Sequence, residues 1–319
     1  MSEPLVIAVP SKGRLKEQVD AWLADCGLHL RAAGGSRGYM ASIPGHSDVL
    51  VRLLSAGDIA EALDAGEVHM GVTGEDLLRE RAEVDNRVTF LRPLGFGRAD
   101  LVVAAPRSWL DVDTMEDLEA VSHDILARTG RRMRVATKYV TQTRAFFARH
   151  GLVDYRITES GGATEGAPAA GTAELIVDIT TTGATLAANG LKILNDGLIL
   201  ASQAHLVSSQ AAEWSASQLA AAERLLRIIE ARSAAHESAM LVWPDTDADA
   251  QPVVDALVAG GASRRPYGLL VPAAQLSGAA LALTQAGVGP VTVSRPEFVF
   301  DLSCGSFEEL AASVSRKLT

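Results

Sequence analysis

Cysteine is scarce in this chain. The two cysteines among its 319 residues, Cys26 and Cys304, lie far apart and show no CxxC spacing. Their scarcity excludes a disulfide framework or a zinc cluster, and it predicts two buried thiols in a reducing compartment. The seven histidines show no metal-ligand spacing, and no Ser/His or Cys/His arrangement indicates a covalent mechanism. We therefore expect no metal site built from side chains alone.

Long apolar runs and an excess of positive charge are also missing. No stretch is long and apolar enough to cross a bilayer, and the N-terminal apolar run is too short for a signal peptide. The net charge of −10 and the pI near 5.2 argue against a nucleic-acid or anionic-lipid partner. We expect a cytoplasmic protein without nucleic-acid or membrane partners, in which any anionic substrate meets local positive groups.

What the chain does contain is a regular alternation of strand-like and helix-like segments. With 48% hydrophobic and 21% charged residues, it is long enough for two or three domains with hydrophobic cores. Thr114 and Asp117 form a capping box that opens a helix, and further helices are expected near residues 141 and 165. The alternation predicts an α/β fold with mostly parallel sheets covered on both faces. Apolar runs typical of strands occupy residues 5–9, 49–54, 68–72, 88–94, 101–105, 134–137, 155–158 and 175–179.

The most informative stretch is EGAPAAGTAELIVDITTTGATL, at residues 165–186. A short apolar run ends at Asp178, and a hydroxyl-rich turn then leads into a helix-compatible segment from Ala184. Free backbone N–H groups, threonine hydroxyls and a glycine at such a turn favour a bound phosphate. An ordinary helix N-cap is the alternative explanation of the threonines. Glu165 and Asp178 add acceptors for sugar hydroxyls, which favours a phosphorylated sugar over a bare anion.

The spacing within this segment resembles, position for position, the signature of the ATP phosphoribosyltransferases, which catalyse the first committed step of histidine biosynthesis. The matching residues are Glu165, Gly171, Ala173, Ile176, Asp178, Ile179, Thr182, Gly183, Thr185 and Leu186. The resemblance covers residues 5–207 and implies a two-lobed core like that of a periplasmic binding protein, with the active site in the cleft. It implies that residues 1–107 and 187–210 form the first lobe and that residues 108–186 form the second.

The resemblance also implies a reaction and a substrate-binding set. N1 of ATP displaces pyrophosphate from the anomeric carbon of phosphoribosyl pyrophosphate, and Mg²⁺ travels mainly on the phosphates. The alternative, from another class, is a cytoplasmic non-catalytic two-lobed binding or sensor protein for a phosphorylated metabolite. The dense signature counts against it. Expected substrate-binding residues in the signature are Glu165, Asp178, Thr180, Thr181, Thr182, Gly183, Ala184 and Thr185.

Two basic turns are further candidates. Lys12 and Arg14 follow the first strand, and the resemblance implies a catalytic role for them facing the nucleotide and the pyrophosphate. Lys138 and Arg144 match a family segment upstream of the signature and are expected to bind substrate. An ordinary surface loop and a solvated first helical turn remain the alternatives for these two segments.

One position departs from the family pattern. Many members carry an arginine three residues before the Asp of an Asp-Ile pair, whereas this chain has Ser55 before Asp58. Arg52 is three residues away along a strand, so it should point to the other face of the sheet. The acidic helix start at Glu75 and Asp76 is explained sufficiently by the helix dipole. The cations that remain as substitutes for the arginine are Lys12, Arg14 and Arg37.

Residues 211–319 are expected to form a linker helix over 211–236 and a small C-terminal α/β domain. Its expected strands are 239–243, 267–271 and 288–293, its helices 249–258 and 275–285, and a final helix starts at Ser306. The long form of the family uses this region to bind histidine and to organise a hexamer, and it has two strands between the helices. This version is therefore expected to be shortened in the middle. Its few apolar strands favour burial in a homo-oligomer, dimer or hexamer, while histidine inhibition stays open.

Overall fold

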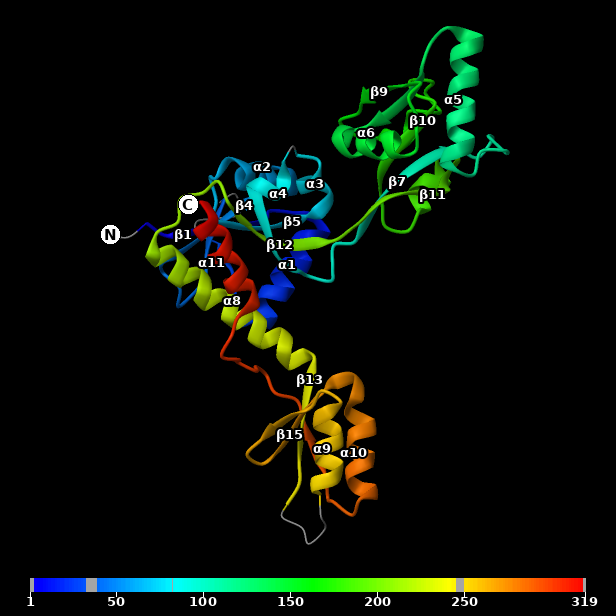
Figure 1. Cartoon of the computed structure of the whole chain (residues 1–319). Helices are drawn as coiled ribbons and strands as arrows, with labels where there is room; N and C mark the ends of the chain where they lie inside the picture. The colour runs from blue at the N-terminus through cyan, green and yellow to red at the C-terminus, as the bar shows by residue number, and fades with distance from the viewer. Residues whose placement is uncertain (1–2, 33–38, 82, 245–249, 318–319) are drawn as a thin grey trace.

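The computed structural model describes residues 3–32, 39–81, 83–244 and 250–317. Three sheets, of seven, five and four strands, form three units (Figure 1). The first two units, here called lobe I and lobe II, face each other. The third is joined to lobe I at the far end of a long helix. This arrangement confirms the expected α/β fold with a two-lobed core and a small C-terminal unit. The expectation of mostly parallel sheets is wrong, because antiparallel pairs outnumber parallel ones among the described strands.

Lobe I is built on the seven-stranded sheet, whose strand order is β2-β3-β4-β1-β5-β12-β6. Strand β1 lies parallel to β4 and β5, whereas β12 runs antiparallel to β5 and β6. The strands are β1 (Leu5–Pro10), β2 (Arg31–Ala32), β3 (Met40–Ser42), β4 (Val49–Leu54), β5 (Met70–Gly74), β6 (Val88–Pro93) and β12 (Ala204–Ser209). The helices are α1 (Gly13–Asp25), α2 (Ala56–Ala65), α3 (Glu75–Arg79) and α4 (Val84–Arg87).

Lobe II is built on the five-stranded sheet, with the order β11-β7-β10-β8-β9. The predicted capping box is confirmed, because the Thr114 hydroxyl accepts a hydrogen bond from the backbone N–H of Asp117 and the Asp117 carboxylate accepts one in return. The strands are β7 (Ala99–Pro106), β8 (Met133–Thr137), β9 (Tyr155–Glu159), β10 (Leu175–Thr180) and β11 (Leu191–Ser202). The helical segments are α5 (Met115–Thr129), α6 (Val140–Arg149), the 3₁₀ turn η1 (Thr164–Gly166) and α7 (Ala184–Ala188).

The lobe boundaries expected at residues 107 and 187 differ from the edges of the sheets. Strand β7 pairs with β10 and β11 within the lobe II sheet, so lobe II begins at Ala99 and continues to Ser202. The chain crosses between the lobes at residues 94–98 and again at Gln203. Gly95 and Gly97 adopt positive φ angles of 73° and 64° in the first crossing, a conformation that glycine allows at no steric cost.

The prediction of a helix near residue 165 is wrong, since η1 is a single 3₁₀ turn. Glycines at 161, 162 and 166 and a proline at 168 make a longer helix costly in this segment. The helix expected over 211–236 is shorter than predicted. It begins after Ser215, whose hydroxyl caps the backbone N–H of Gln218, and forms α8 (Ala216–His236).

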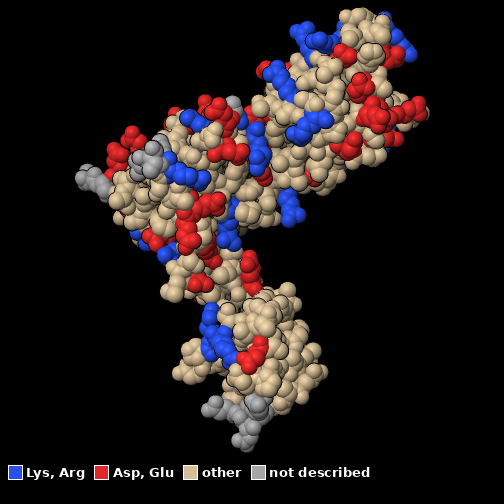
Figure 2. All heavy atoms as spheres, viewed as in Figure 1, with Lys and Arg blue, Asp and Glu red and all other residues tan. Residues whose placement is uncertain are grey.

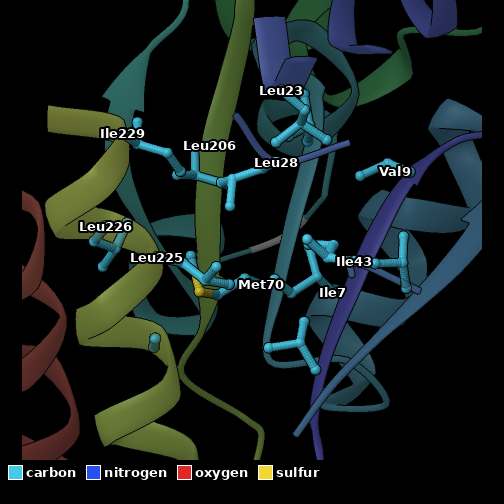
Figure 3. Close-up of a cluster of buried hydrophobic side chains, with 14 of the residues drawn as sticks. Ile7, Val9, Leu23, Leu28, Ile43, Met70, Leu206, Leu225, Leu226 and Ile229 are labelled. Atoms are coloured by element: carbon cyan, nitrogen blue, oxygen red, sulfur yellow. The ribbon is translucent and has the colours of Figure 1, made fainter. Parts of the chain in front are cut away.

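Helix α8 belongs to the core of lobe I rather than to a free linker. Figure 3 shows Leu225 and Ile229 of α8 in one buried cluster with Met70 and Leu206 of the sheet. The last helix, α11 (Gly305–Lys317), packs on α8 and β6, and its Leu310 is buried in the same cluster. The expected domain at residues 211–319 is therefore divided, because both of its terminal helices complete lobe I.

The C-terminal unit contains one more strand than expected. Its sheet has the order β14-β15-β13-β16, and one face is covered by two helices. The antiparallel pair β14–β15 lies between these helices, so the expected shortening in the middle is wrong. The elements are β13 (Ser238–Val242), α9 (Gln251–Ala259), β14 (Ser263–Arg265), β15 (Gly268–Pro272), η2 (Ala273–Gln275), α10 (Leu276–Gln285) and β16 (Thr292–Ser294). Residue 249, the expected start of the first helix, lies outside the described residues.

Candidate active site

The cleft between the lobes holds a cavity of about 480 Å³. Because β1, β4 and β5 are parallel, the segments that follow them meet at one edge of the lobe I sheet. Arg14, Ala56 and Gly74 from these segments line the cavity, and Ile179 and Thr181 close it from lobe II. The site thus has the geometry of an inter-lobe ligand site, in which each lobe supplies one wall.

A second cavity of about 490 Å³ lies in the same cleft on the other side of α3. Gly57 and Arg81 line it from lobe I, and Lys138 and Tyr139 line it from lobe II. Leu77 of α3 lines both cavities, so this helix divides the cleft. Basic side chains gather where the two lobes meet (Figure 2).

The threonine loop at the end of β10 is shaped by its own hydroxyls. The Thr180 hydroxyl accepts a hydrogen bond of 2.8 Å from the N–H of Gly183, and Thr182 accepts one of 3.4 Å from Ala184. Gly183 has a φ of 72°, so the turn needs glycine there. Thr181 and Thr185 are exposed, and α7 has only five residues. So short a helix adds little dipole, so the groups of this loop that suit an anion are its N–H groups and hydroxyls.

Asp178 lies beneath this loop in a half-buried position. Burial raises the pKa of its carboxyl group; the Ile179 N–H at 2.8 Å and Lys138 act in the opposite direction, and Glu165 adds to the rise. Lys138 and Glu165 are therefore both close enough to influence Asp178. The neighbouring Ala163 has a φ of 51°, a strained conformation for a non-glycine residue that costs about 1–2 kcal/mol. The structure brings the two predicted carboxylates and the predicted lysine together.

Of the other predicted cations in the described residues, only Arg14 lines one of the two cleft cavities. Arg14 lines the first cavity, whereas Lys12 is the exposed N-cap of α1 and lines neither cavity. Arg144 is exposed on α6, where its charge acts on Tyr155, so the structure does not bring it to the cleft cavities. Arg37 lies outside the described residues.

Ser55 has a structural role in place of the family arginine. Its hydroxyl accepts a hydrogen bond of 3.2 Å from the N–H of Asp58 and caps α2. Arg52 lies 3.7 Å from the carboxylate of Glu67, which follows the opposite end of α2 from Ser55. The helix N-terminus that faces the cleft therefore carries no cation of its own at these positions.

Sequence reasoning missed Arg98, a cation of the first cavity. It lines the first cavity from the crossing segment, and its backbone carbonyl accepts a hydrogen bond of 3.4 Å from the Thr181 hydroxyl. The glycines at 95 and 97 were the available signal, because a crossing segment carries residues into the cleft. The expected boundary at residue 107 concealed that signal.

The cleft of this two-lobed α/β protein carries a threonine loop on one wall and arginines on the other, which is the chemistry of a site for anionic substrates. A family model described as HisG, ATP phosphoribosyltransferase, matches residues 55–231. The chain belongs to the ATP phosphoribosyltransferase family. It catalyses the transfer of the phosphoribosyl group from phosphoribosyl pyrophosphate to N1 of ATP with release of pyrophosphate, the first step of L-histidine biosynthesis.

Individual relatives agree with the family model over the whole chain. An ATP phosphoribosyltransferase of Caulobacter vibrioides is 62% identical over 100% of both chains. One of Bradyrhizobium diazoefficiens is 49% identical over 99% of this chain and 100% of its own. The ATP phosphoribosyltransferase (HisG:HisZ) complex of Thermotoga maritima matches with a TM-score of 0.53 and 25% identity, over 71% of this chain and 98% of that one. The non-catalytic sensor alternative is not favoured. Among the described helices, none has the length and apolar character needed to cross a membrane.

Proposed function

We propose that the inter-lobe cleft is the active site and that the lobes divide the substrates between them. The observation that carries this proposal is that Arg14 of lobe I and Thr181 of lobe II line the same cavity. The loop from Thr180 to Thr185 holds the 5′-phosphate through N–H groups and hydroxyls. Asp178 and Glu165 accept hydrogen bonds from the ribose hydroxyls. ATP then approaches from the lobe I wall.

The proposed chemistry asks little of individual side chains. As the bond from the anomeric carbon to pyrophosphate breaks, positive charge grows on the ribose ring and negative charge grows on the leaving group. Asp178 lies on the ribose side and stabilises the positive charge, while Arg14 lies on the side of the leaving group and stabilises the negative charge. Holding the two substrates in line supplies most of the remaining rate enhancement.

Arg98 is our candidate for the cation that replaces the family arginine at Ser55. It lines the same cavity as Arg14, and its backbone is bound to Thr181 of the proposed phosphate loop. A guanidinium group suits pyrophosphate because its planar fork of donors pairs with two oxygens. Lys12, which is exposed beside Arg14, is left as a longer-range cation at the rim.

Mg²⁺ is proposed to enter with the substrates. In the part of the chain that the structure describes, no group of three His, Cys, Asp or Glu side chains could hold a metal ion. We propose that the cation is bound mainly through pyrophosphate oxygens. The two carboxylates of Asp178 and Glu165 would be its nearest protein ligands. When bound, Mg²⁺ neutralises charge that develops on the leaving pyrophosphate.

The experiment that tests the site compares variants in the forward reaction. Purified protein is mixed with ATP, Mg²⁺ and phosphoribosyl pyrophosphate, and the adduct is followed by its ultraviolet absorbance. We expect Arg14→Ala to raise KM at least tenfold, since a hydrogen bond to a charged group contributes about 1.5–3 kcal/mol. Arg128→Ala is a matched control, because Arg128 pairs with Asp124 on the exposed face of α5. Equal KM values for both variants would show that the cavity is not the substrate site.

We also propose that the C-terminal unit assembles the enzyme into a homo-oligomer and that this region is where histidine would act as an inhibitor. The face of this unit seen in Figure 2 is mostly uncharged apart from one small group of charged side chains, and Tyr267 and Leu281 are 82% and 60% exposed. Replacing residues 239–296 with a short Gly/Ser linker keeps α8 and α11 in place. We expect light scattering to report a smaller assembly, with any histidine sensitivity lost. An unchanged assembly would place the contacts in the lobes. The cytoplasm is the proposed location, because ATP and phosphoribosyl pyrophosphate are made there.

A further inference from the structure

Helices α3 of lobe I and α6 of lobe II bind each other's polar termini across the cleft. The Glu80 carboxylate, at the end of α3, accepts hydrogen bonds of 2.6 Å from the N–H of Thr141 and 3.2 Å from the N–H of Gln142. The Gln142 side chain donates in the other direction, to the backbone carbonyl of Asp76 at 2.8 Å. The first turn of α6 has no side-chain cap of its own at Tyr139, so Glu80 of the other lobe caps it.

A second contact, beside the first, is buried. The Tyr139 hydroxyl donates a hydrogen bond of 2.6 Å to one carboxylate oxygen of Asp76. The other carboxylate oxygen accepts one of 2.9 Å from the Ser202 hydroxyl, at the end of β11 where the chain crosses back to lobe I. Tyr139 and Asp76 are 1% and 5% exposed. Asp76 therefore joins α3, the crossing segment and lobe II at one point.

The local sequence leaves room for this contact. A Cβ atom added at Gly74 would clash with Oδ1 of Asp76, so glycine there lets the carboxylate fold back over the start of α3. Burial, and after it the charge of Asp76, raise the pKa of the Tyr139 hydroxyl. The hydroxyl stays protonated and donating throughout the physiological range. Both features indicate a fixed contact rather than an accidental surface pair.

The position of these contacts relates them to the substrates. They lie on α3, which separates the two cleft cavities, and Tyr139 follows directly after Lys138. Lys138 in turn influences Asp178. A shift of the first turn of α6 would therefore carry Lys138 with it and would change the distance between the arginines of lobe I and the phosphate loop.

We propose that Glu80, Asp76 and Tyr139 are positioning residues that fix the angle between the lobes in the substrate-free enzyme. Asp76 lines the first cavity and Glu80 and Tyr139 line the second, but we assign them no contact with the reacting atoms. They act by holding the start of α6, and with it Lys138, against lobe I. The kinetic part of this inference rests on the proposed active site, whereas the geometric part does not.

The geometric part is tested on the full chain without substrate. Spin labels on cysteines introduced at Glu61 of α2 and Ala120 of α5, both exposed, report the distance between the lobes. We expect one narrow distance distribution in the parent protein and a broader or shifted one in Glu80→Gln and in Tyr139→Phe. Asp117→Asn, which removes a helix cap wholly inside lobe II, should leave the distribution unchanged. Unchanged distance distributions in both Glu80→Gln and Tyr139→Phe would overturn the inference.

The kinetic part uses the same three variants. We expect Glu80→Gln and Tyr139→Phe each to raise KM for phosphoribosyl pyrophosphate about three- to tenfold, the range of one weakened hydrogen bond, with a smaller change in kcat. Because both contacts act on one turn, the double variant should raise KM by less than the product of the two single effects. Asp117→Asn should lower the melting temperature without changing KM. If Glu80→Gln and Tyr139→Phe lower the melting temperature while both KM and the distance distribution stay unchanged, their role is only structural. If the distance distribution changes while KM does not, the proposed site fails instead.

Discussion

Replacing Asp178 with asparagine should have opposite effects on binding and on stability. The carboxylate is half-buried, and its Oδ1 is held by the Ile179 N–H at 2.8 Å. Asparagine keeps the size of the side chain and one oxygen for that contact. It removes the charge that we propose for the ribose hydroxyls. The substitution therefore separates the electrostatic role of Asp178 from its packing.

The expected magnitudes follow from the surroundings of the side chain. A hydrogen bond to a charged group contributes about 1.5–3 kcal/mol, which corresponds to about a 10- to 150-fold weaker affinity for phosphoribosyl pyrophosphate. Stability should change in the other direction. Burial raises the pKa of Asp178 in the folded protein, so the ionised form opposes folding, and the loss of stability develops as pH rises through the folded pKa. Asparagine removes that loss at neutral pH.

Calorimetric titration and a melting curve measure the two effects. We expect weaker binding together with a melting temperature that is equal to or higher than that of the parent protein at pH 7. The difference in melting temperature should disappear below about pH 4, where the unfolded carboxyl is protonated as well. A variant that melts several degrees lower at pH 7, or one that binds with full affinity, would refute this reasoning.

Three further predictions concern single positions. Gly183→Ala should cost about 1–2 kcal/mol of stability, because its φ of 72° disfavours any side chain, and calorimetry should show weaker substrate binding in addition; normal binding would contradict a phosphate cradle. Arg98→Ala should raise KM about tenfold with no change in melting temperature; an unchanged KM would remove Arg98 from the site. Arg232, and after it His236, lower the pKa of Asp25, so Asp25→Asn should melt earlier at pH 7; this difference should begin to shrink near pH 4, the unfolded pKa, and vanish only as pH falls through the lower folded pKa, and a constant difference across pH would contradict the ion pair.

Much of the site was predictable because its signals are local. The apolar run before Asp178, the threonines and Gly183 all lie within nine residues, and the strand and turn that they predict match β10 and its loop. The strand expected at residues 49–54 coincides with β4. Such segments are set by hydrophobic run length and by turn chemistry, which a single sequence displays directly.

The features that were missed depend on pairing between distant segments. Strand β7 reads as a further strand of lobe I until β10 and β11 are seen on either side of it. Glu80 reads as an ordinary exposed carboxylate, because the helix that it caps begins 60 residues later and belongs to the other lobe. Arg98 shows no motif at all. Sequence periodicity specifies which face of a segment is apolar, but it does not specify which partner covers that face.

The C-terminal region is also joined to lobe I by contacts between segments that are distant in the sequence. The chain enters the C-terminal unit through α8 and returns through α11, and both helices are buried in the core of lobe I. A chain ending at Gln210 would therefore expose the apolar face that Leu225 and Ile229 now cover, at a cost of several kcal/mol. Loss of activity in that truncated chain would report on folding rather than on assembly. Arg232 of α8 also binds the backbone carbonyl of Glu297 at 2.7 Å, which ties the returning segment along the helix. Any force on the C-terminal unit consequently reaches lobe I first. It passes from there to lobe II through the two crossing segments and the contacts between α3 and α6.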